Sequence, residues 1–471
     1  MNAGRMTAAD LGRVHVVGCG GVGMSGLAEI LLRRGFPVSG SERDDRPSLA
    51  RLRKLGCAVS SGHDESALDD VDTVVYSTAI PDDHPELAAA RRRGLRVLHR
   101  SEALAAVMAG YRSVAVTGTH GKTSTTGMVV SALWQSGIDL SFVVGGDLAG
   151  HGSAAHGSSD VFVAEADESD RSFLHYAPHA AVVTNIDSDH LDTYGDLAGL
   201  SAAFLQFCGQ VQPGGFVVTS ADDSHCRALA ERARTQGLTV YTYGRHEDAD
   251  LRVSGLSSSA TRTRYHAHLD GTPLGEVIVP VPGAHLGLNS AAALLTTVRL
   301  GVSAEKAIEG LRAYPGVGRR FELKGFAGGV RVYDDYAGHH TALAASLRAL
   351  RHVAGRGQLI AVCQPCGTFR TQHFQAELAA ALGLADQAIV MEVFERTAAD
   401  ERGHDGAELA QAVPLATGSK AFAGSWSETI GEVTRRARPG DLVVTLGAAP
   451  MSLMADQILG ALRVRKPGGV R

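Results

Sequence analysis

The segment 114–123 contains the residues best suited to bind a phosphate. Its pattern predicts a buried strand, a turn with two glycines and a helix that continues to Gln135. Backbone amides at such a turn, together with the helix dipole, favour an anion. Lys122 is expected to reach the outer phosphates of a nucleotide, and the Thr123 hydroxyl to bind magnesium. The usual phosphate loop has a glycine where this chain has Val116, so the match is to a shorter variant.

A second glycine-rich turn, at 18–23, follows the apolar run 14–17 and precedes a predicted helix. A further strand ends at Glu42, about 20 residues after the glycines, which satisfies the dinucleotide fingerprint. This pattern favours an NAD-binding domain as one hypothesis. Its physical content is narrower, because amides at a helix N-terminus hold any diphosphate. A sugar nucleotide fits the turn as well as NAD does.

Acidic and histidine side chains follow two other predicted strands. Glu165 closes the strand that begins at residue 160, and His190 closes the segment that begins at residue 180. Ligands of parallel sheets bind at such carboxyl ends. Magnesium prefers oxygen ligands and takes imidazole less often, so Glu165 and His190 alone do not indicate a metal site. Together with a phosphate loop in the same sheet, they favour metal binding. We expect Asp167, Glu168 and Asp170 to be partly exposed to solvent.

Composition restricts the class of protein. The 471 residues are too many for one core and predict two to four domains. Apolar residues make up 44%, charged residues 20%, and the net charge is −5, which indicates neither a nucleic-acid nor a membrane surface. No apolar run reaches the length of a membrane span, and residues 1–12 lack the features of a signal peptide. Six scattered cysteines, including the lone pair Cys363 and Cys366, predict packing rather than disulfides. The predicted location is cytoplasmic.

Strands and helices alternate along most of the chain, which predicts an α/β fold with doubly wound sheets. The breaks in this alternation place three domains at residues 1–112, 113–314 and 315–471. Between 250 and 282 the spacing becomes short and alternating, so a small antiparallel excursion is expected there. The tail 465–471 is basic and glycine-rich and is expected to be disordered.

Several of these motifs together resemble the Mur ligases of peptidoglycan synthesis. The resemblance covers nearly the whole chain, and its markers lie in the family's order at 15–26, 118–123, 165–170, 185–192 and 318–322. It implies a Rossmann-like domain for a UDP-sugar, a P-loop ATPase-like central domain and a Rossmann-like domain for an amino acid. It also implies ATP- and Mg²⁺-dependent amide formation through an acyl phosphate. The branch that it resembles most joins L-alanine to UDP-N-acetylmuramate. Such an enzyme is expected to be a monomer or homodimer.

The resemblance assigns roles to individual residues. The catalytic set is Lys122, Glu165, His190 and His339. The expected metal ligands are Thr123, Glu165 and His190. The expected ATP-binding residues are Gly118, Thr119, His120, Gly121, Lys122, Thr123, Ser124, His285, Asn289, Arg320 and Asp335. Those expected to bind the UDP-sugar are Gly18, Gly20, Gly21, Gly23, Met24, Ser25, Glu42, Ser77 and Thr78. Those expected to bind the amino acid are Tyr336, His339 and Arg370.

The third domain departs from the family's pattern. The family motif Asp-Asp-Tyr-Ala-His-His-Pro-Thr-Glu is replaced at 334–342, Gln-Pro-His is replaced by 364–366, and a late Gly-Ala-Gly-Asp by 447–450. Small residues at Gly338, Ala342, Cys366 and Gly367 leave more room around Arg370. A small apolar pocket discriminates one methylene by only about 1–3 kcal/mol, so weak selectivity for L-alanine, or another amino acid, is expected.

Three alternatives to this ligase follow from the same residues. A related enzyme of specialised metabolism would use the same chemistry with a different amino acid or acyl acceptor. A nucleotide-binding regulator with little activity is disfavoured by the intact Lys122, Thr123, Glu165 and His190. An NAD dehydrogenase is disfavoured further, because it would not need the loop at 118–123.

Overall fold

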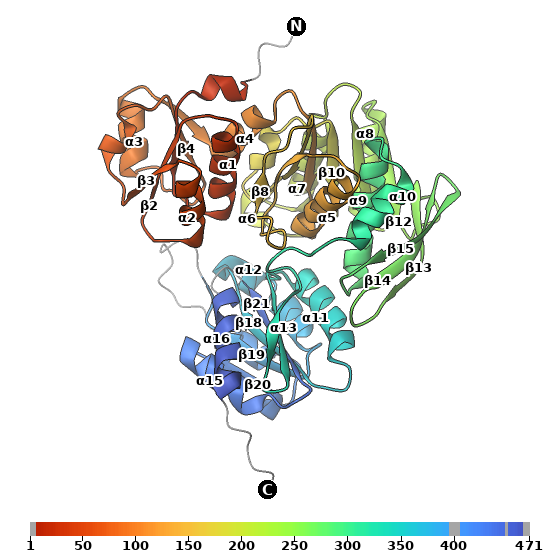
Figure 1. The fold of residues 1–471 in the computed structure, drawn as a ribbon. Coiled ribbons are helices and arrows are strands. Elements are labelled where there is room, and N and C mark those ends of the chain that lie inside the picture. Colours follow the sequence, from red (N-terminus) through yellow and green to blue (C-terminus); the bar gives the residue numbers. More distant parts are fainter. Residues whose placement is uncertain (1–5, 395–405, 448–450, 465–471) are drawn as a thin grey trace. The chain divides into compact units, whose positions relative to one another are not determined.

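The computed structural model describes residues 6–394, 406–447 and 451–464, which form three β-sheets with helices packed on them (Figure 1). The chain divides into two compact units. The first consists of Met1–Val253, Ala267–Gly275 and Asn289–Pro315, and the second of Ser254–His266, Glu276–Leu288 and Gly316–Arg471. The predicted α/β fold is confirmed. Among the described residues, no helix has both the length and the apolar character needed to cross a membrane.

The first sheet is parallel, with the spatial order β3-β2-β1-β4-β5. Its strands are β1 (Val14–Val17), β2 (Val38–Glu42), β3 (Ala58–Ser61), β4 (Thr73–Tyr76) and β5 (Arg96–His99). The helices are η1 (Ala8–Leu11), α1 (Val22–Arg33), α2 (Pro47–Lys54), η2 (Glu65–Leu68), α3 (Pro85–Arg92) and α4 (Arg100–Met108).

Alternation along β1 places its side chains in two different cores. Val14 and Val16 belong to the cluster that contains Leu27 of α1, whereas Val17 belongs to the cluster that contains Leu87 of α3. Successive side chains of a strand point to opposite faces, so α1 and α3 belong to the cores on opposite faces of β1. The glycine turn between β1 and α1 therefore lies at the carboxyl end of the central strand.

The second sheet has the order β15-β14-β13-β12-β11-β10-β6-β9-β7-β8. Its strands are β6 (Arg112–Thr117), β7 (Ser141–Val143), β8 (Ala154–Ala155), β9 (Val161–Glu165), β10 (Ala180–Val183), β11 (Phe216–Ser220), β12 (Val240–Gly244), β13 (Leu251–Ser258), β14 (Thr263–Leu269) and β15 (Thr272–Val279). The helices are α5 (Lys122–Gln135), η3 (Ser172–His175), α6 (Leu191–Tyr194), α7 (Leu197–Cys208), α8 (Ser224–Thr235), α9 (Ala284–Arg299) and α10 (Ala304–Arg312).

Three neighbouring parallel strands of this sheet position the candidate site. β6 pairs with β9 on one side and with β10 on the other, and Val116 of β6 lies opposite both Glu165 and Val182. The loops after these strands consequently leave the sheet at one edge, where ligands of open α/β sheets bind. The segment predicted to be an antiparallel excursion contains β13, β14 and β15, which neighbour one another in chain order.

The third sheet has the order β16-β17-β21-β18-β19-β20, with an antiparallel β16–β17 pair and parallel pairing elsewhere. Its strands are β16 (Glu322–Ala327), β17 (Val330–Asp335), β18 (Leu359–Gln364), β19 (Gln387–Met391), β20 (Lys420–Ala423) and β21 (Leu442–Gly447). The helices are α11 (His340–Ala354), α12 (Thr368–His373), α13 (Gln375–Leu382), α14 (Gly406–Ala412), η4 (Thr417–Ser419), α15 (Trp426–Arg436) and α16 (Met451–Val464). The tail 465–471 and the altered positions 448–450 lie outside the described residues.

Candidate active site

The turn between β6 and α5 has room only for glycine at two positions. Gly118 and Gly121 have φ values of +121° and +81°, which L side chains rarely adopt. A Cβ atom would lie 2.2 Å from the Thr184 hydroxyl at the first position and 2.8 Å from the Asn289 side chain at the second. Ser124 is buried in the first turn of α5. This backbone supports the predicted phosphate loop and brings Asn289, an expected ATP residue, beside it.

Lys122 occupies the start of α5 and is held by oxygen atoms. Its Nζ donates to the carbonyls of Gly118, at 2.9 Å, and Thr119, at 3.2 Å, and to Glu168 Oε1 at 2.8 Å. Burial alone would lower the pKa of Lys122, but the carboxylates of Glu168 and Asp167 raise it. The side chain is therefore a largely buried ammonium, 16% exposed, whose positive charge the neighbouring carboxylates stabilise.

The acidic run after β9 is less exposed than the sequence predicts. Asp167 and Asp170 are half-buried, but Glu168 is completely buried, so the prediction of partial exposure is wrong for Glu168. Burial raises the pKa of Glu168, and the ammonium of Lys122 opposes this shift. Its second oxygen makes no hydrogen bond among the described residues. The acidic run in the sequence therefore did not indicate that Glu168 is the ion-pair partner of Lys122.

Two of the three expected metal ligands are in direct contact. The Thr123 hydroxyl donates to Glu165 Oε1 at 2.9 Å, so a hydroxyl and a carboxylate oxygen converge at the loop. The prediction that His190 closes a strand is wrong, because β10 ends at Val183 and His190 is the N-cap residue of α6, with φ of +53°. Its Nε2 lies 3.7 Å from Glu168 Oε1. Oxygen atoms of Thr123 and Glu165 fit the preference of Mg²⁺.

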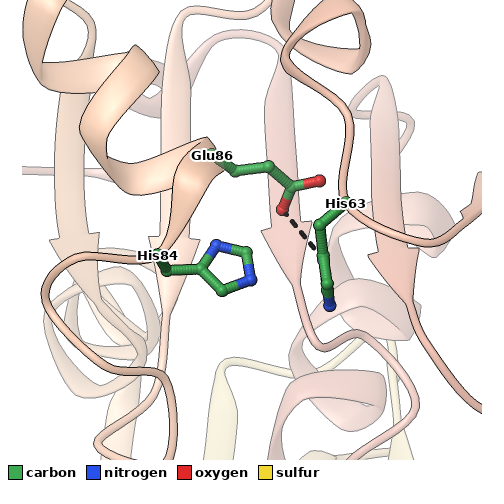
Figure 2. A group of neighbouring side chains, drawn as sticks. All are labelled: His63, His84 and Glu86. Atoms are coloured by element: carbon green, nitrogen blue, oxygen red, sulfur yellow. Dashed lines mark ion pairs between the residues drawn. The ribbon is translucent and has the colours of Figure 1, made fainter.

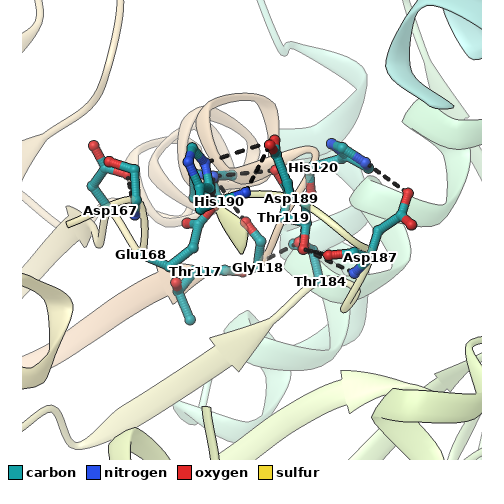
Figure 3. Close-up of polar contacts among 12 residues, drawn as sticks. Thr117, Gly118, Thr119, His120, Asp167, Glu168, Thr184, Asp187, Asp189 and His190 are labelled. Atoms are coloured by element: carbon teal, nitrogen blue, oxygen red, sulfur yellow. Dashed lines mark hydrogen bonds and ion pairs between the residues drawn. The ribbon is translucent and has the colours of Figure 1, made fainter. Parts of the chain in front are cut away.

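The segment after β10 fixes the shape of the phosphate loop, a role that the sequence did not predict. The Thr184 hydroxyl donates to the carbonyl of His120 at 2.6 Å. Asn185 accepts from the His120 amide and donates to its carbonyl, both at 2.9 Å. The His120 ring lies 3.0 Å from Asp187, and the Thr119 amide donates to the backbone of Asn185 (Figure 3). Four hydrogen-bonding groups therefore hold two loop residues that are expected to bind ATP.

The glycine turn of the first sheet is bordered by two arginines that the sequence did not single out. The Gly20 amide donates to Glu42 Oε2 at 3.0 Å, so this acid binds the turn itself. A Cβ atom at Gly20 would lie 2.8 Å from Arg46, and one at Gly23 would lie 2.8 Å from the Arg100 guanidinium. Positive charge beside a helix N-terminus suits a diphosphate.

Other predicted UDP-sugar residues lie around the same turn. Gly18 has φ of +68°, and Gly21 is the N-cap residue of α1. Met24 is buried, whereas the Ser25 hydroxyl donates to the carbonyl of Val22 at 3.1 Å. The turn therefore supplies backbone amides at the start of α1, and the Ser25 side chain is engaged within the helix.

Ser77 and Thr78 follow β4 at the carboxyl edge of the first sheet. Ser77 is half-buried and its carbonyl accepts from a backbone amide within the turn. The exposed Thr78 hydroxyl donates to Asp170 and lies 3.1 Å from His99 Nε2. Residues that follow β4 and β9 thus meet within the first compact unit.

The second compact unit contains the other expected nucleotide residues. The guanidinium groups of Arg319 and Arg320 lie 4.8 Å and 4.9 Å from the centre of the Tyr336 ring. Asp335 is buried at the end of β17 and accepts a hydrogen bond from Ser346. Burial raises the pKa of Asp335, while the Ser346 hydrogen bond and Arg320 oppose the shift.

The expected amino-acid residues Tyr336, His339 and Arg370 follow the strands β17 and β18 in the same unit. His339 is the N-cap residue of that helix, and its ring centre lies 5.3 Å from that of Phe374. Arg370 is half-buried in α12. His285, expected to contact ATP, is half-buried near the start of α9, where burial lowers its pKa to about 4.

Models of three Mur ligase domains match consecutive parts of the chain. The model described as the catalytic domain of the Mur ligase family matches residues 13–112, the Mur ligase middle domain matches 116–297, and the glutamate ligase domain matches 319–449. The chain belongs to the Mur ligase family. This membership accounts for all three sheets and replaces the dehydrogenase hypothesis for the first glycine turn.

Relatives within the Mur ligase family share most of the chain. UDP-N-acetylmuramate–L-alanine ligase of Salinispora arenicola is 56% identical over 99% of this chain and 91% of its own, and that of Acidothermus cellulolyticus is 50% identical over 97% and 96%. The crystal structure of the MurC ligase from Thermotoga maritima has a TM-score of 0.78 at 26% identity and covers 95% of this chain and 98% of its own. A murein peptide ligase from Psychrobacter arcticus, at 23% identity, shares the fold with a TM-score of 0.72, covering 96% and 99%.

Proposed function

We propose that this protein is a UDP-N-acetylmuramate–L-alanine ligase of peptidoglycan synthesis. The observation that carries the proposal is the 56% identity, over 99% of the chain, to a ligase of that name. The phosphate loop with Lys122, Thr123 and Glu165 supports ATP-dependent chemistry. The reaction joins the carboxylate of the UDP-sugar to the amine of L-alanine. The carboxylate oxygen first takes the terminal phosphoryl group with release of ADP, and the amine then displaces inorganic phosphate.

ATP would supply the phosphoryl group, and Mg²⁺ would neutralise part of its charge. Lys122 places a fixed positive charge at the loop, where the charge on the phosphoryl group must be stabilised. Thr123 and Glu165 would hold the metal through oxygen, and Asn289 lies beside the loop backbone at Gly121. Glu168 accepts a hydrogen bond from the ammonium and keeps it in position at the loop.

The first domain would hold the UDP-sugar through the turn at 18–23. Arg100 places its guanidinium beside Gly23 at the start of α1, and Arg46, which pairs with Glu42, lies beside Gly20. These groups suit the diphosphate. The adenine and amino-acid roles of His285, Arg320, Asp335, Tyr336, His339 and Arg370 stay part of the proposal.

The relatives favour L-alanine over the alternative of another amino acid or acyl acceptor. Arg370 offers a planar guanidinium that can bind the carboxylate of any α-amino acid through two hydrogen bonds. The altered residues around it therefore bear on selectivity rather than on the reaction type. We further propose that the protein acts in the cytoplasm as a monomer or homodimer.

The experiment is a direct assay with purified protein, Mg²⁺, ATP, UDP-N-acetylmuramate and each amino acid in turn. We expect release of phosphate and a product heavier than the UDP-sugar by one alanine residue, with L-alanine as the best substrate. Phosphate release that needs the sugar but prefers another amino acid would favour the specialised enzyme. A protein that binds ATP without turnover under every condition would favour the regulator.

A further inference from the structure

Three histidines and a glutamate lie together on the α3 side of the first sheet, outside the glycine turn. His15 lies in β1, on the same face as Val17, and His63 lies two residues after the end of β3. His84 and Glu86 belong to the start of α3, and Figure 2 shows these two side chains with His63. One side-chain ligand atom from each of His63, His84 and Glu86 lies within 4.8 Å of the others.

Three polar side-chain atoms of this cluster are buried without hydrogen-bond partners. His15 and Glu86 are completely buried and His84 is 8% exposed. His15 Nε2, His84 Nδ1 and Glu86 Oε1 make no hydrogen bond with any described residue. A buried polar atom without a partner destabilises the folded state, so three of them in one place indicate a missing partner.

Hydrogen bonds on the outside of the cluster orient the groups that remain free. Ser41 Oγ donates its hydrogen to Glu86 Oε2 at 2.7 Å and lies 3.1 Å from His63 Nδ1. Because the hydroxyl has a single hydrogen, it must accept from the Nδ1 hydrogen of His63. The lone pair of His63 is then on Nε2. His15 Nδ1 is similarly placed 2.8 Å from Ser39.

The donor types of the cluster suit a cation. A carboxylate oxygen of Glu86 and one ring nitrogen each of His63 and His84 converge at its centre. Carboxylates and imidazoles are side chains that bind metals through their unprotonated atoms.

We propose that His63, His84 and Glu86 bind a zinc ion in the first domain. Two imidazole nitrogens and one carboxylate form a donor set that suits Zn²⁺ rather than Mg²⁺. Zn–N and Zn–O bonds of about 2.0–2.2 Å place tetrahedral ligands about 3.3 Å apart, so ligand atoms within 4.8 Å of one another need to approach by at most about 1.5 Å. His15 Nε2, 3.7 Å from Glu86 Oε2, lies close enough to bind the same ion or to orient the carboxylate.

This site differs from the proposed magnesium site in both position and chemistry. Its ligands belong to the loop after β3 and to α3, whereas Thr123 and Glu165 lie at the second sheet. The His63 side chain is 24% exposed, which gives an ion access from solvent. Because the ion joins α3 to the loop after β3, its effect is on the stability of the first domain rather than on phosphoryl transfer.

The test is zinc titration of the full-length protein after removal of metals, by calorimetry in the presence of saturating Mg²⁺. We expect one zinc equivalent, and zinc should raise the midpoint of thermal unfolding. His63→Asn and His84→Asn should each weaken this binding at least 100-fold, and Ser41→Ala, which loses the hydrogen bond to Glu86, about 10- to 100-fold. The matched control is His246→Asn. His246 is exposed, pairs with Asp248 and is distant in sequence from His63 and His84, so this substitution should leave the zinc titration unchanged.

Cobalt provides a second measurement that does not depend on how well the variants fold. Co²⁺ in place of zinc should give the intense visible absorption of a low-coordinate site in the wild-type protein, and zinc should displace it. Absence of a zinc equivalent in the wild-type protein would overturn the proposal. So would a folded His63→Asn/His84→Asn variant that takes up zinc as the wild type does, because the ion would then bind elsewhere. Loss of ligase activity is not a readout here, so the proposed function can fail or hold independently.

Discussion

Replacement of Lys122 by alanine removes the buried ammonium at the phosphate loop. This group donates to two loop carbonyls and lies 2.8 Å from Glu168. A preorganised charge of this kind is worth roughly what one oxyanion-hole donor is worth, about 2.7–4 kcal/mol. We therefore expect kcat for phosphate release to fall by about 100- to 1000-fold. Lys306→Ala, which changes an exposed lysine of α10, is the matched control and should keep full activity.

The same substitution also affects stability, and the effect has a defined pH dependence. Loss of one partner of a buried ion pair costs about 3–5 kcal/mol. Without Lys122, burial raises the folded-state pKa of Glu168 further above its ordinary value of 4.5. The folded state then binds a proton that the unfolded state has released, so stability falls as pH rises above about 4.5 and continues to fall up to the raised pKa. Glu168→Gln in the same chain removes the ionisable group and this pH dependence.

Thermal unfolding between pH 5 and 8 and steady-state kinetics separate these effects. Between pH 5 and pH 8, the midpoint of thermal unfolding should fall further for the Lys122→Ala protein than for the wild type. The Lys122→Ala/Glu168→Gln protein should recover stability and stay inactive. Turnover of either variant within tenfold of the wild type would refute the placement of Lys122 at the phosphoryl group.

Three further predictions concern the metal, the first domain and the amino acid. Glu165→Ala should raise the magnesium concentration required for half-maximal activity, because the Thr123 hydroxyl loses its carboxylate partner; an unchanged magnesium titration would exclude Glu165 as a ligand. Calorimetry should detect binding of UDP-N-acetylmuramate and none of NAD(H), with weaker binding by Arg100→Ala; tight NAD(H) binding would contradict the diphosphate assignment. Arg370→Ala should raise KM for the amino acid more than it changes kcat. In the wild-type protein, kcat/KM should favour L-alanine over glycine by about 10- to 200-fold at most. An Arg370→Ala protein with unchanged KM would place the pocket elsewhere.

Local patterns predicted the parts of the fold that depend on neighbouring residues. The runs before the two glycine turns are β1 and β6, because an apolar run followed by glycine and a helical pattern is sufficient to indicate a strand, turn and helix. The third sheet likewise has the predicted alternation of strands and helices. Its β16 and β20 are harder to recognise, because both have partly exposed residues and weak alternation. Their positions depend on pairing with β17 and β19.

Parts of the candidate site depend on contacts that sequence spacing does not contain. Glu168 lies 46 residues from Lys122, and a run of acids normally indicates solvent exposure, so its burial was missed. Arg100 approaches Gly23 across the packing of two elements. His63 and Glu86 were separated by 23 residues and belonged to no recognised motif. Each of these contacts is set by the tertiary structure rather than by local periodicity.

The transfer of oxygen from substrate to phosphate tests the proposed chemistry most directly. UDP-N-acetylmuramate with ¹⁸O in both carboxylate oxygens is incubated with ATP, Mg²⁺, L-alanine and the enzyme, and the released phosphate is analysed by mass spectrometry. If the carboxylate attacks the terminal phosphoryl group, each phosphate carries one ¹⁸O atom and the amide product retains the other. Phosphate without the label would show that the phosphoryl group went to water or another acceptor, and would contradict activation of the carboxylate.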